Sequence, residues 1–398
     1  MVAVSHSSVK VVRRCGVPKS RTIHTLVGEG PADVFGVHNG GVANLVRGVV
    51  ERIFTVDYGE GAQQPYPQPV EGFRRQVSEA FSFLKGTAVC LGPWSVQRFL
   101  EHYHDARVRR RYEDARDSLM LSDVVRADSD VRPFVKAEKV NFTAKRDPAP
   151  RIISPRDPRY NLAVGLFVKP VEGILYKHLN EMCGGRTVMK GLNALETGQA
   201  VLEAWESFED PVAVSLDAKR FDQHTRGGAL SYEQRVYLLY FGGEDRKRFA
   251  ELLSWQLSSK CVAHTPEAKV SYTMDIRASG DMNTGLGTCL IACSLVHSYC
   301  TRVKLRYRLL NNGDDCVVIC ERREVGKLDG FFDHCKLAGY HMEIEDPVDK
   351  LELVSFCHTR PLRFGDGMCK MVRDYPESIG KDLVTVLPLK TPKDWEKW

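Results

Sequence analysis

The sequence lacks the features that mark several large classes of protein. No apolar run approaches the roughly 18 residues that a membrane-spanning helix needs, and the first residues show no signal-peptide pattern. The 12 cysteines include no Cys-x-x-Cys pair, which argues against a disulfide framework or a zinc site and fits a reducing cytosol. The Gly-x4-Gly-Lys-Ser/Thr loop of helicases and ATPases is also absent, so that class lacks its main support.

Net charge alone does not indicate a partner for this chain. With 56 basic and 51 acidic residues the balance is +5, and the hydrophobic and charged fractions, 43% and 27%, are ordinary for a globular protein. Basic residues are nevertheless concentrated in 132–159 and in 107–111. Such patches can line an RNA channel. For 107–117, where acidic residues interleave, a solvated helix explains the pattern equally well.

What the sequence does contain is a pair of acids between two short apolar runs. Asp314 and Asp315 follow Gly313, with apolar residues at 305–310 before them and at 317–319 after them. This arrangement predicts a β-hairpin with the carboxylates at its tip. A divalent cation would allow two carboxylates to lie close together despite their repulsion. For this motif on its own, an ordinary Asp-rich turn remains the alternative.

A second acidic cluster lies upstream, at the end of another apolar run. The strand-like segment 211–216 ends on Asp217, and Asp222 follows soon after. A strand that delivers an acid at its end can lie beside the hairpin and bring Asp217 opposite Asp314 and Asp315. Three carboxylates from adjacent elements suit a pair of Mg²⁺ ions, as used for in-line phosphoryl or nucleotidyl transfer.

A segment rich in glycine and small hydroxyl residues, 279–288, lies between the two acidic elements. Its composition predicts a flexible loop that can approach a nucleic-acid backbone closely. The apolar run 289–296 that follows predicts a buried helix. A plain connector explains the loop when it is taken alone, but its position between the acids favours a function.

Taken together, these segments resemble the palm of a viral RNA-dependent RNA polymerase. Motif A is matched by Asp217-x4-Asp222, motif B by Ser279-Gly280 with Asn283-Thr284-Gly285, and motif C by Gly313-Asp314-Asp315. The likeness is to positive-strand RNA plant viruses of the tombusvirus and carmovirus kind, through residues 134–139, 148–156 and 158–161. It extends over most of the chain.

The resemblance implies a role for each of these acids. Asp217 and Asp314 would be the principal ligands of two Mg²⁺ or Mn²⁺ ions, and Asp315 a weaker or more distant ligand. These three catalytic acids would support nucleotidyl transfer from NTPs on an RNA template, which replicates a positive-strand RNA genome.

The resemblance also implies that the ribose 2′-hydroxyl of the incoming nucleotide is sensed by motifs A and B. The residues assigned to ribose selection are Asp222, Ser279, Asn283 and Thr284. A carboxylate such as that of Asp222 can accept a hydrogen bond from this hydroxyl. A reverse transcriptase is expected to carry a bulky side chain close after its first acid, so Asp222 favours ribonucleotides.

The basic stretch 132–159 resembles motif F, the finger element that holds the triphosphate. Its candidate phosphate-binding residues are Lys136, Lys139, Lys145 and Arg151. Arg151 is the best placed, because it follows a proline and leads an apolar strand. The candidates for RNA contact elsewhere are Gly280, Gly285, Gly313, Phe356 and Cys357.

The fold implied by the resemblance is α+β, with a right-hand arrangement of an antiparallel palm sheet, mostly helical fingers and a thumb. The fingers would comprise 1–210 and 223–275, the palm 211–222 and 276–355, and the thumb 356–398. This thumb would be either minimal or incomplete. Local patterns also predict long helices at 94–112 and 161–180.

The implied partners are an RNA template and product and ribonucleoside triphosphates. Viruses of this kind copy RNA on membranes, so we expect replication complexes in the host cytoplasm. Membrane attachment would come from an upstream viral replicase protein, because this chain has no apolar run long enough; the sequence identifies no host factor.

Three other functions are alternatives to a polymerase that copies RNA into RNA. Asp222 and Asn283 argue against a reverse transcriptase, which a dNTP assay would separate. The presence of all three metal-binding acids argues against a non-enzymatic RNA-binding replication subunit with a vestigial palm. A metal-dependent nuclease would have no need of Asn283 or of the basic finger strand.

Overall fold

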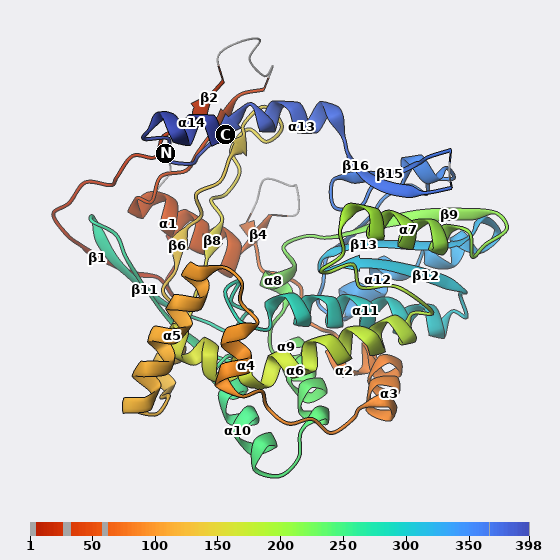
Figure 1. The fold of residues 1–398 in the computed structure, drawn as a ribbon, viewed down its shortest axis with the longest axis horizontal. Helices are drawn as coiled ribbons and strands as arrows, with labels where there is room; N and C mark the ends of the chain where they lie inside the picture. The colour runs from red at the N-terminus through yellow and green to blue at the C-terminus, as the bar shows by residue number, and fades with distance from the viewer. Residues whose placement is uncertain (1–4, 27–32, 58–62, 366, 398) are drawn as a thin grey trace.

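The computed structural model describes residues 5–26, 33–57, 63–365 and 367–397. A four-stranded antiparallel sheet lies on one side of the molecule, with a large group of helices below it in the view of Figure 1. The expected mixture of helices and antiparallel sheet is therefore confirmed. Within the described ranges, no helix is both long and apolar enough to cross a bilayer.

The four-stranded central sheet has the order β12-β13-β9-β14. Its strands are β9 (Pro211–Ala218), β12 (Tyr307–Asn312), β13 (Asp315–Glu321) and β14 (Met342–Ile344). The register pairs Leu309 with Val318, and Val318 with Val214 on the other side. The hairpin predicted around the Asp314–Asp315 pair is thus confirmed, with β12 and β13 as its arms.

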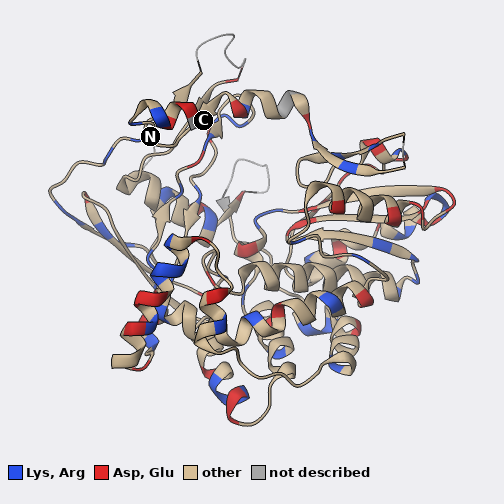
Figure 2. Cartoon of the chain, viewed as in Figure 1, with Lys and Arg blue, Asp and Glu red and all other residues tan. Residues whose placement is uncertain are grey.

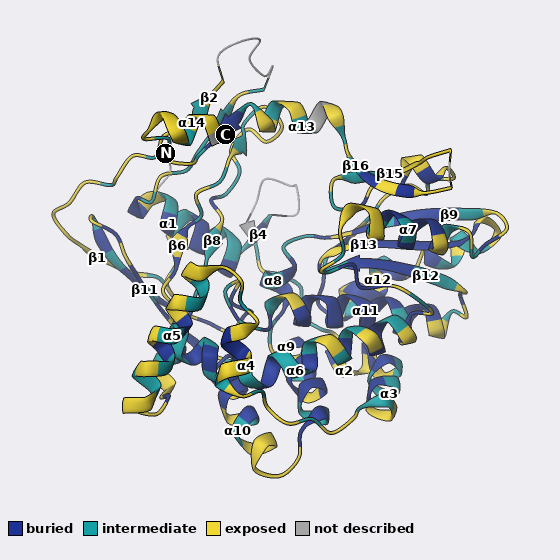
Figure 3. Ribbon diagram, viewed as in Figure 1, coloured by how far each residue is buried: buried dark blue, intermediate teal, exposed yellow. Residues whose placement is uncertain are grey.

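The side chains of the central strands alternate between two hydrophobic clusters. Val214 and Val318 pack in a large cluster with α11 (Thr284–Arg302), whereas Ala213 and Val317 pack in a smaller one with α7 (Ala194–Trp205). Because successive side chains of a strand point to opposite faces, both faces of the sheet are covered. Figure 3 shows the resulting burial of the central strands and α11 in dark blue. This explains why β9 and β13 are nearly continuous apolar runs.

Two long helices support this sheet from below. Helix α11 confirms the predicted buried helix and extends it on both sides. Helix α6 (Pro158–Met182) is longer than the predicted 161–180, because Asp157 caps its first turn by accepting a hydrogen bond from the Arg159 backbone N–H at 3.0 Å. The other helices of this region are α2 (Phe73–Gln76), α3 (Ser78–Thr87), α8 (Phe221–His224), α9 (Gly228–Tyr237), α10 (Gly243–Ser254) and α12 (Phe331–Leu337).

The single helix predicted at 94–112 is wrong. The chain forms α4 (Val96–Glu101) and then a separate helix, α5 (Ala106–Leu121). Asp105 accepts backbone hydrogen bonds at the start of α5 and so begins a new helix within the predicted one. Arg110 pairs with Asp114 at 3.2 Å, and Figure 2 shows basic and acidic residues alternating along α5. This pattern favours the solvated helix over an RNA-binding patch.

A second, three-stranded sheet lies on the opposite side of the molecule in Figure 1. Its strands, in the order β1-β11-β10, are β1 (Lys10–Arg13), β10 (Ser259–His264) and β11 (Ala268–Met274). It shares a hydrophobic cluster with α1 (Val42–Val49) and with β6 (Phe134–Val135), which pairs with β8 (Ile152–Ile153). The basic stretch 132–159 is therefore anchored to this sheet.

The C-terminal segment runs from the central sheet to an N-terminal strand. Strands β15 (Thr359–Arg363) and β16 (Cys369–Arg373) pair with each other, and Cys369 and Met371 pack in the smaller cluster of the central sheet. Helix α13 (Tyr375–Asp382) then leads across the top of Figure 1 to β17 (Val384–Thr385), which pairs with β2 (His24–Thr25). The segment ends with α14 (Pro392–Lys397).

Candidate active site

The acids of motifs A and C meet at one end of the central sheet. Strand β9 pairs with β13 so that Leu216 lies opposite Cys316, and one more step along this register brings Asp217 opposite Asp315. On the other side of β9, Glu343 of β14 lies opposite Asp217. Residues that are directly opposite in an antiparallel pair share a face of the sheet. We call Asp217, Asp314, Asp315 and Glu343 the acidic edge.

Gly313 allows the tight turn that presents Asp314 and Asp315. Its φ of +95° is a conformation that residues with a side chain rarely adopt. The Asn311 side-chain amide donates a hydrogen bond to the Gly313 carbonyl at 2.7 Å and stabilises the turn. Gly313 therefore has a role in shaping the hairpin.

The acids of the acidic edge destabilise one another's charges. Partial burial raises the pKa of Asp217, and the negative charges of Glu343, Asp315 and Asp314 raise it further. Burial and the charge of Asp314 likewise raise the pKa of Asp315. Clustered carboxylates of this kind are the hard oxygen donors that Mg²⁺ and Mn²⁺ prefer. Among the described residues, however, no three His, Cys, Asp or Glu side chains are already arranged as a metal site.

A pocket of about 360 Å³ opens beside the acidic edge. Its walls come from the hairpin turn, the 279–288 loop, strand β8 and the chain around Arg52. The predicted site residues that line it are Arg151, Asp222, Ser279, Thr284, Gly285, Gly313 and Asp314. The structure therefore brings together members of all four predicted motifs around one cavity.

Arg52, Arg151 and Arg220 line this pocket, and we call these three arginines the basic wall. Burial, together with the charges of Arg220 and Arg151, lowers the pKa of Arg52 to about 10. Arg220 adopts a left-handed backbone conformation, with a φ of +53°, and its guanidinium donates to the carbonyl of Glu51. An anion in the pocket would offset the repulsion among these cations.

The three predicted phosphate-binding lysines do not line the pocket. Lys136 pairs with Glu138 at 3.0 Å, and Lys139 donates a hydrogen bond to the carbonyl of Lys381 in α13. Lys145 is exposed in a turn. Of the four predicted residues, Arg151 alone faces the cavity, although 58% of its side chain is exposed and Glu138 lies 3.4 Å from it.

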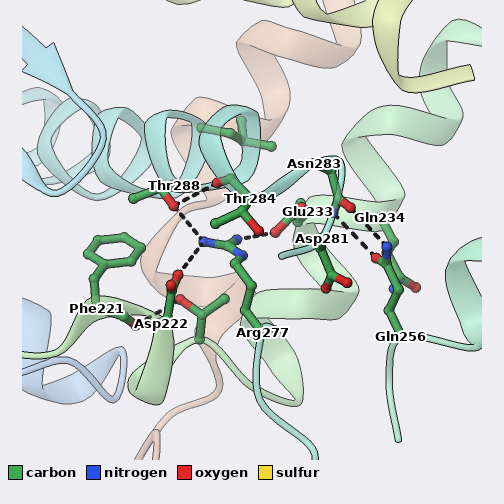
Figure 4. A network of polar contacts seen from close by, with 12 residues as sticks. Phe221, Asp222, Glu233, Gln234, Gln256, Arg277, Asp281, Asn283, Thr284 and Thr288 are labelled. Carbon is green, nitrogen blue, oxygen red and sulfur yellow. Dashed lines mark hydrogen bonds and ion pairs between the residues drawn. The ribbon is translucent and has the colours of Figure 1, made fainter. Parts of the chain in front are cut away.

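The residues assigned to ribose selection are divided between the pocket and the interior. Asp222, Ser279 and Thr284 line the pocket, but Asn283 does not. The Asn283 side chain is buried, donating to Glu233 at 2.5 Å and accepting from Gln256 at 2.9 Å. Figure 4 shows Asn283 turned away from Asp222. Because its side-chain amide is occupied by buried partners, Asn283 cannot contact a ligand in the pocket in this conformation.

Arg277 takes the place beside Asp222 that Asn283 was expected to hold. The guanidinium of Arg277 lies 3.7 Å from the Asp222 carboxylate and donates to the Thr288 hydroxyl at 2.9 Å (Figure 4). Asp222 keeps 38% of its side chain exposed, yet the protein around it removes enough water to raise its pKa to about 6. The opposing attraction of Arg277 limits this rise.

Three of the residues predicted to contact RNA make contacts within the protein. A Cβ atom at Gly280 would lie 2.7 Å from the Cα atom of Pro155, so the glycine permits the close approach of two chain segments. Phe356 is buried in the smaller hydrophobic cluster. The thiol of Cys357 lies 3.5 Å from the Asp315 carboxylate. Gly285 remains on the pocket wall.

Sequence reasoning missed several residues that the structure places at the site. They are Arg52, Lys190, Arg220, Arg277, Thr288 and Glu343. Arg220 and Thr288 lie inside or directly beside predicted motifs, so their positions in the sequence could have identified them as site residues. Arg52 lies outside every predicted motif, and Arg277 lies just before motif B without belonging to it, so tertiary packing brings both to the pocket.

Comparison with known proteins identifies the family. Residues 9–398 match the family described as viral RNA dependent RNA polymerase. The RNA-directed RNA polymerase of Tobacco necrosis virus (strain D) is 39% identical over 96% of this chain and 53% of its own length. The corresponding protein of Melon necrotic spot virus is 40% identical over 96% of this chain and 48% of its own length.

A third relative, the RNA-directed RNA polymerase of Turnip crinkle virus, is 38% identical over 98% of this chain and 50% of its own length. The chain thus spans about half the length of the curated relatives that it matches. The resemblance noted from the motifs is confirmed: the chain belongs to the viral RNA-dependent RNA polymerase family.

Proposed function

We propose that this chain carries the active site of an RNA-directed RNA polymerase, which joins ribonucleoside triphosphates on an RNA template. The observation that carries the proposal is a single pocket lined both by Asp314 of the acidic edge and by the three arginines of the basic wall. An acid cluster suits the reacting phosphate and its metal ions, and guanidinium groups suit the remaining phosphates of a nucleotide. Family membership supports the same conclusion.

Asp217, Asp314 and Asp315 would hold two Mg²⁺ or Mn²⁺ ions. The raised pKa of Asp217 and of Asp315 fits this role, since bound cations would offset the repulsion that raises both values. When bound, such ions activate the attacking 3′-hydroxyl and stabilise charge on the leaving pyrophosphate. The carboxylates themselves orient the site, with Asp314 reaching the pocket and Asp217 fixed by the sheet register.

The basic wall would bind the triphosphate. Arg151 was expected there from the sequence, and the pocket lining supports adding Arg52 and Arg220. Guanidinium groups bind phosphate oxygens through paired N–H donors, so three of them can fix the orientation of a triphosphate. Lys190, whose ammonium donates to Asn312 at 3.1 Å beside the hairpin turn, is a further cation on the pocket wall.

Asp222 would accept a hydrogen bond from the ribose 2′-hydroxyl, which favours NTPs over dNTPs. The presence of Asp222 therefore favours an RNA polymerase over a reverse transcriptase. A dNTP assay distinguishes the two, because a reverse transcriptase would use dNTPs at least as well as NTPs.

The right-hand arrangement is part of the same proposal. The central sheet would be the palm, the helices and the second sheet the fingers, and the segment from 356 the thumb. An RNA template and product would be the macromolecular partners. Membrane-associated replication in the host cytoplasm, through another replicase protein, is proposed from the family likeness.

The test is incorporation of labelled NTPs on a short RNA template with Mg²⁺, comparing the unaltered chain with Asp314→Asn. We expect template-dependent synthesis that the substitution abolishes, with RNA affinity retained because phosphate contacts elsewhere supply most of it. Asp117→Asn, on the exposed surface of α5, is the matched control and should retain synthesis. Bound RNA without synthesis by the unaltered chain would favour a non-enzymatic subunit.

A further inference from the structure

Arg277, which lines the pocket, also forms the centre of a buried polar network. Its side chain has no exposed surface, and its guanidinium contacts groups on three elements. One terminal nitrogen faces Asp222 at 3.7 Å and donates to Thr288 at 2.9 Å, and the other pairs with Glu233 (Figure 4). Arg277 therefore joins two residues of the pocket wall to one residue of the interior.

Glu233 is itself fixed by a second set of contacts. Only 1% of its side chain is exposed, and its carboxylate accepts hydrogen bonds from the Tyr237 hydroxyl at 2.8 Å and the Asn283 amide at 2.5 Å. Gln256 in turn donates to Asn283 at 2.9 Å. A carboxylate held by this many donors cannot move without leaving buried groups unsatisfied. It therefore holds the Arg277 guanidinium in one orientation.

We infer that the Arg277–Glu233 pair is a positioning unit for ribose selection, which holds Asp222 and Thr288 in place on the pocket wall. The inference rests on the proposed function, because it assumes that this pocket receives a nucleotide. Asn283 acts from behind the wall, through Glu233, and does not contact the ribose. A fixed carboxylate discriminates better than one free to rotate, because its orientation does not have to be restricted on binding.

A purely structural role for the pair makes a different prediction. Loss of a structural pair would lower stability and reduce the use of all nucleotides together, whereas loss of a positioning unit would reduce the preference for NTP over dNTP. Arg156 and Asp281 provide a matched control, since they form another buried pair, with 0% and 2% of their side chains exposed, that does not line the pocket.

The test compares kcat/KM for one NTP and its 2′-deoxy counterpart in four proteins. The unaltered chain and Arg277→Lys are joined by two double variants, Arg277→Met with Glu233→Gln and Arg156→Met with Asp281→Asn. Removing both partners of a pair avoids leaving one buried charge alone, which would unfold the protein more readily. Arg277→Lys keeps the positive charge but loses the planar guanidinium group, whose paired N–H donors contact two partners at once.

We expect the NTP/dNTP ratio to fall roughly tenfold in the Arg277–Glu233 double variant, as expected for loss of an interaction with a charged group. Arg277→Lys should give an intermediate ratio. At pH 8, where Asp222 with its pKa of about 6 is ionised with or without the charge of Asp281, the Arg156–Asp281 double variant should change both substrates equally. An unchanged ratio in the Arg277–Glu233 double variant, or the same fall in the control, would overturn the inference.

A binding measurement separates this inference from the proposed function. Displacement of a fluorescent NTP by unlabelled NTP and dNTP gives a ratio of Kd values that needs no catalysis. If the unaltered chain makes no RNA but binds NTP more tightly, and the Arg277–Glu233 double variant loses that preference, the inference stands and the proposed activity fails. If the unaltered chain shows no preference in binding or synthesis, the inference fails as well.

Discussion

The acidic edge, through Asp314, and the basic wall both contribute to the same pocket, but they are built in different ways. Asp217 and Asp315 are placed by strand register, and Asp314 by a turn next to them in the sequence. Arg52 and Arg220 come from segments far apart in the sequence and meet through tertiary packing. The comparison teaches that backbone pairing fixes the residues that would perform the chemistry, whereas packing between elements fixes those that would bind the nucleotide.

The largest effect is expected at the acidic edge. Asp217→Asn should reduce incorporation roughly a hundredfold or more, because it removes a proposed metal ligand held in place by two neighbouring strands. Glu343→Gln, on the adjacent strand, should have a smaller effect. Single-turnover incorporation at saturating NTP measures both. Equal losses in the two variants would contradict the separate role given to Asp217.

A smaller effect, of another kind, is expected at the basic wall. Arg52→Met should raise the KM for NTP roughly tenfold, since a charge-assisted contact with phosphate is lost, and should leave kcat largely intact. Lys145→Met provides the control, because Lys145 is exposed and does not line the pocket. Steady-state kinetics over a range of NTP concentrations decide the matter. A rise in KM for Lys145→Met but not for Arg52→Met would favour the sequence-based prediction that Lys145 binds phosphate.

The pH dependence of ribose selection sharpens the comparison further. Burial raises the pKa of Asp222 to about 6, with Arg277 opposing the rise and Asp314, Asp281 and Glu233 adding to it. The ionised carboxylate is the better acceptor for a hydroxyl, so the NTP/dNTP ratio should fall as the pH falls through 6. Measuring the ratio from pH 5 to pH 8 tests this. A ratio that stays constant over the range would argue against Asp222 as the selecting group.

The smallest effect on chemistry, and a clear one on stability, is expected at Gly280. An added Cβ would lie 2.7 Å from the Pro155 Cα atom and 2.8 Å from the Ser154 carbonyl oxygen, so Gly280→Ala must push two backbone segments apart. Overpacking of this kind costs about 1–3 kcal/mol. Denaturant unfolding should show the loss, and Gly86→Ala, where nothing lies within 4 Å of the added atom, should not. Equal stability of the two variants would mean that the contact relaxes freely.

Strand register explains why three residues of the acidic edge, Asp217, Asp314 and Asp315, were predictable. Segments 211–216 and 317–319 are apolar because both faces of the central sheet are covered, and each brings an acid to the same end. Helix α11 was recognisable for a similar reason, since it is buried on almost every side. The interrupted helix at 94–112 was not, because one capping residue, Asp105, decides the break.

Apart from Arg151, the residues of the basic wall could not be predicted from local patterns, and neither could the Arg277 network. Lys139 has the residue type of a phosphate ligand, but contact with the C-terminal helix α13 takes it elsewhere. Asn283 lies in the expected loop, yet its side chain faces the interior because Glu233 and Gln256 provide buried partners for it. Arg277 gains its position only when α8, α9 and α11 have packed around it.

The most direct test of the account measures RNA-templated NTP incorporation against NTP concentration for the unaltered chain, Asp314→Asn and Arg52→Met. The account predicts synthesis by the unaltered chain, no synthesis at any NTP concentration for Asp314→Asn, and a normal maximal rate reached only at higher NTP concentration for Arg52→Met. Asp314→Asn retaining the maximal rate, or Arg52→Met losing it while keeping its KM, would contradict the division between an acidic edge for chemistry and a basic wall for binding.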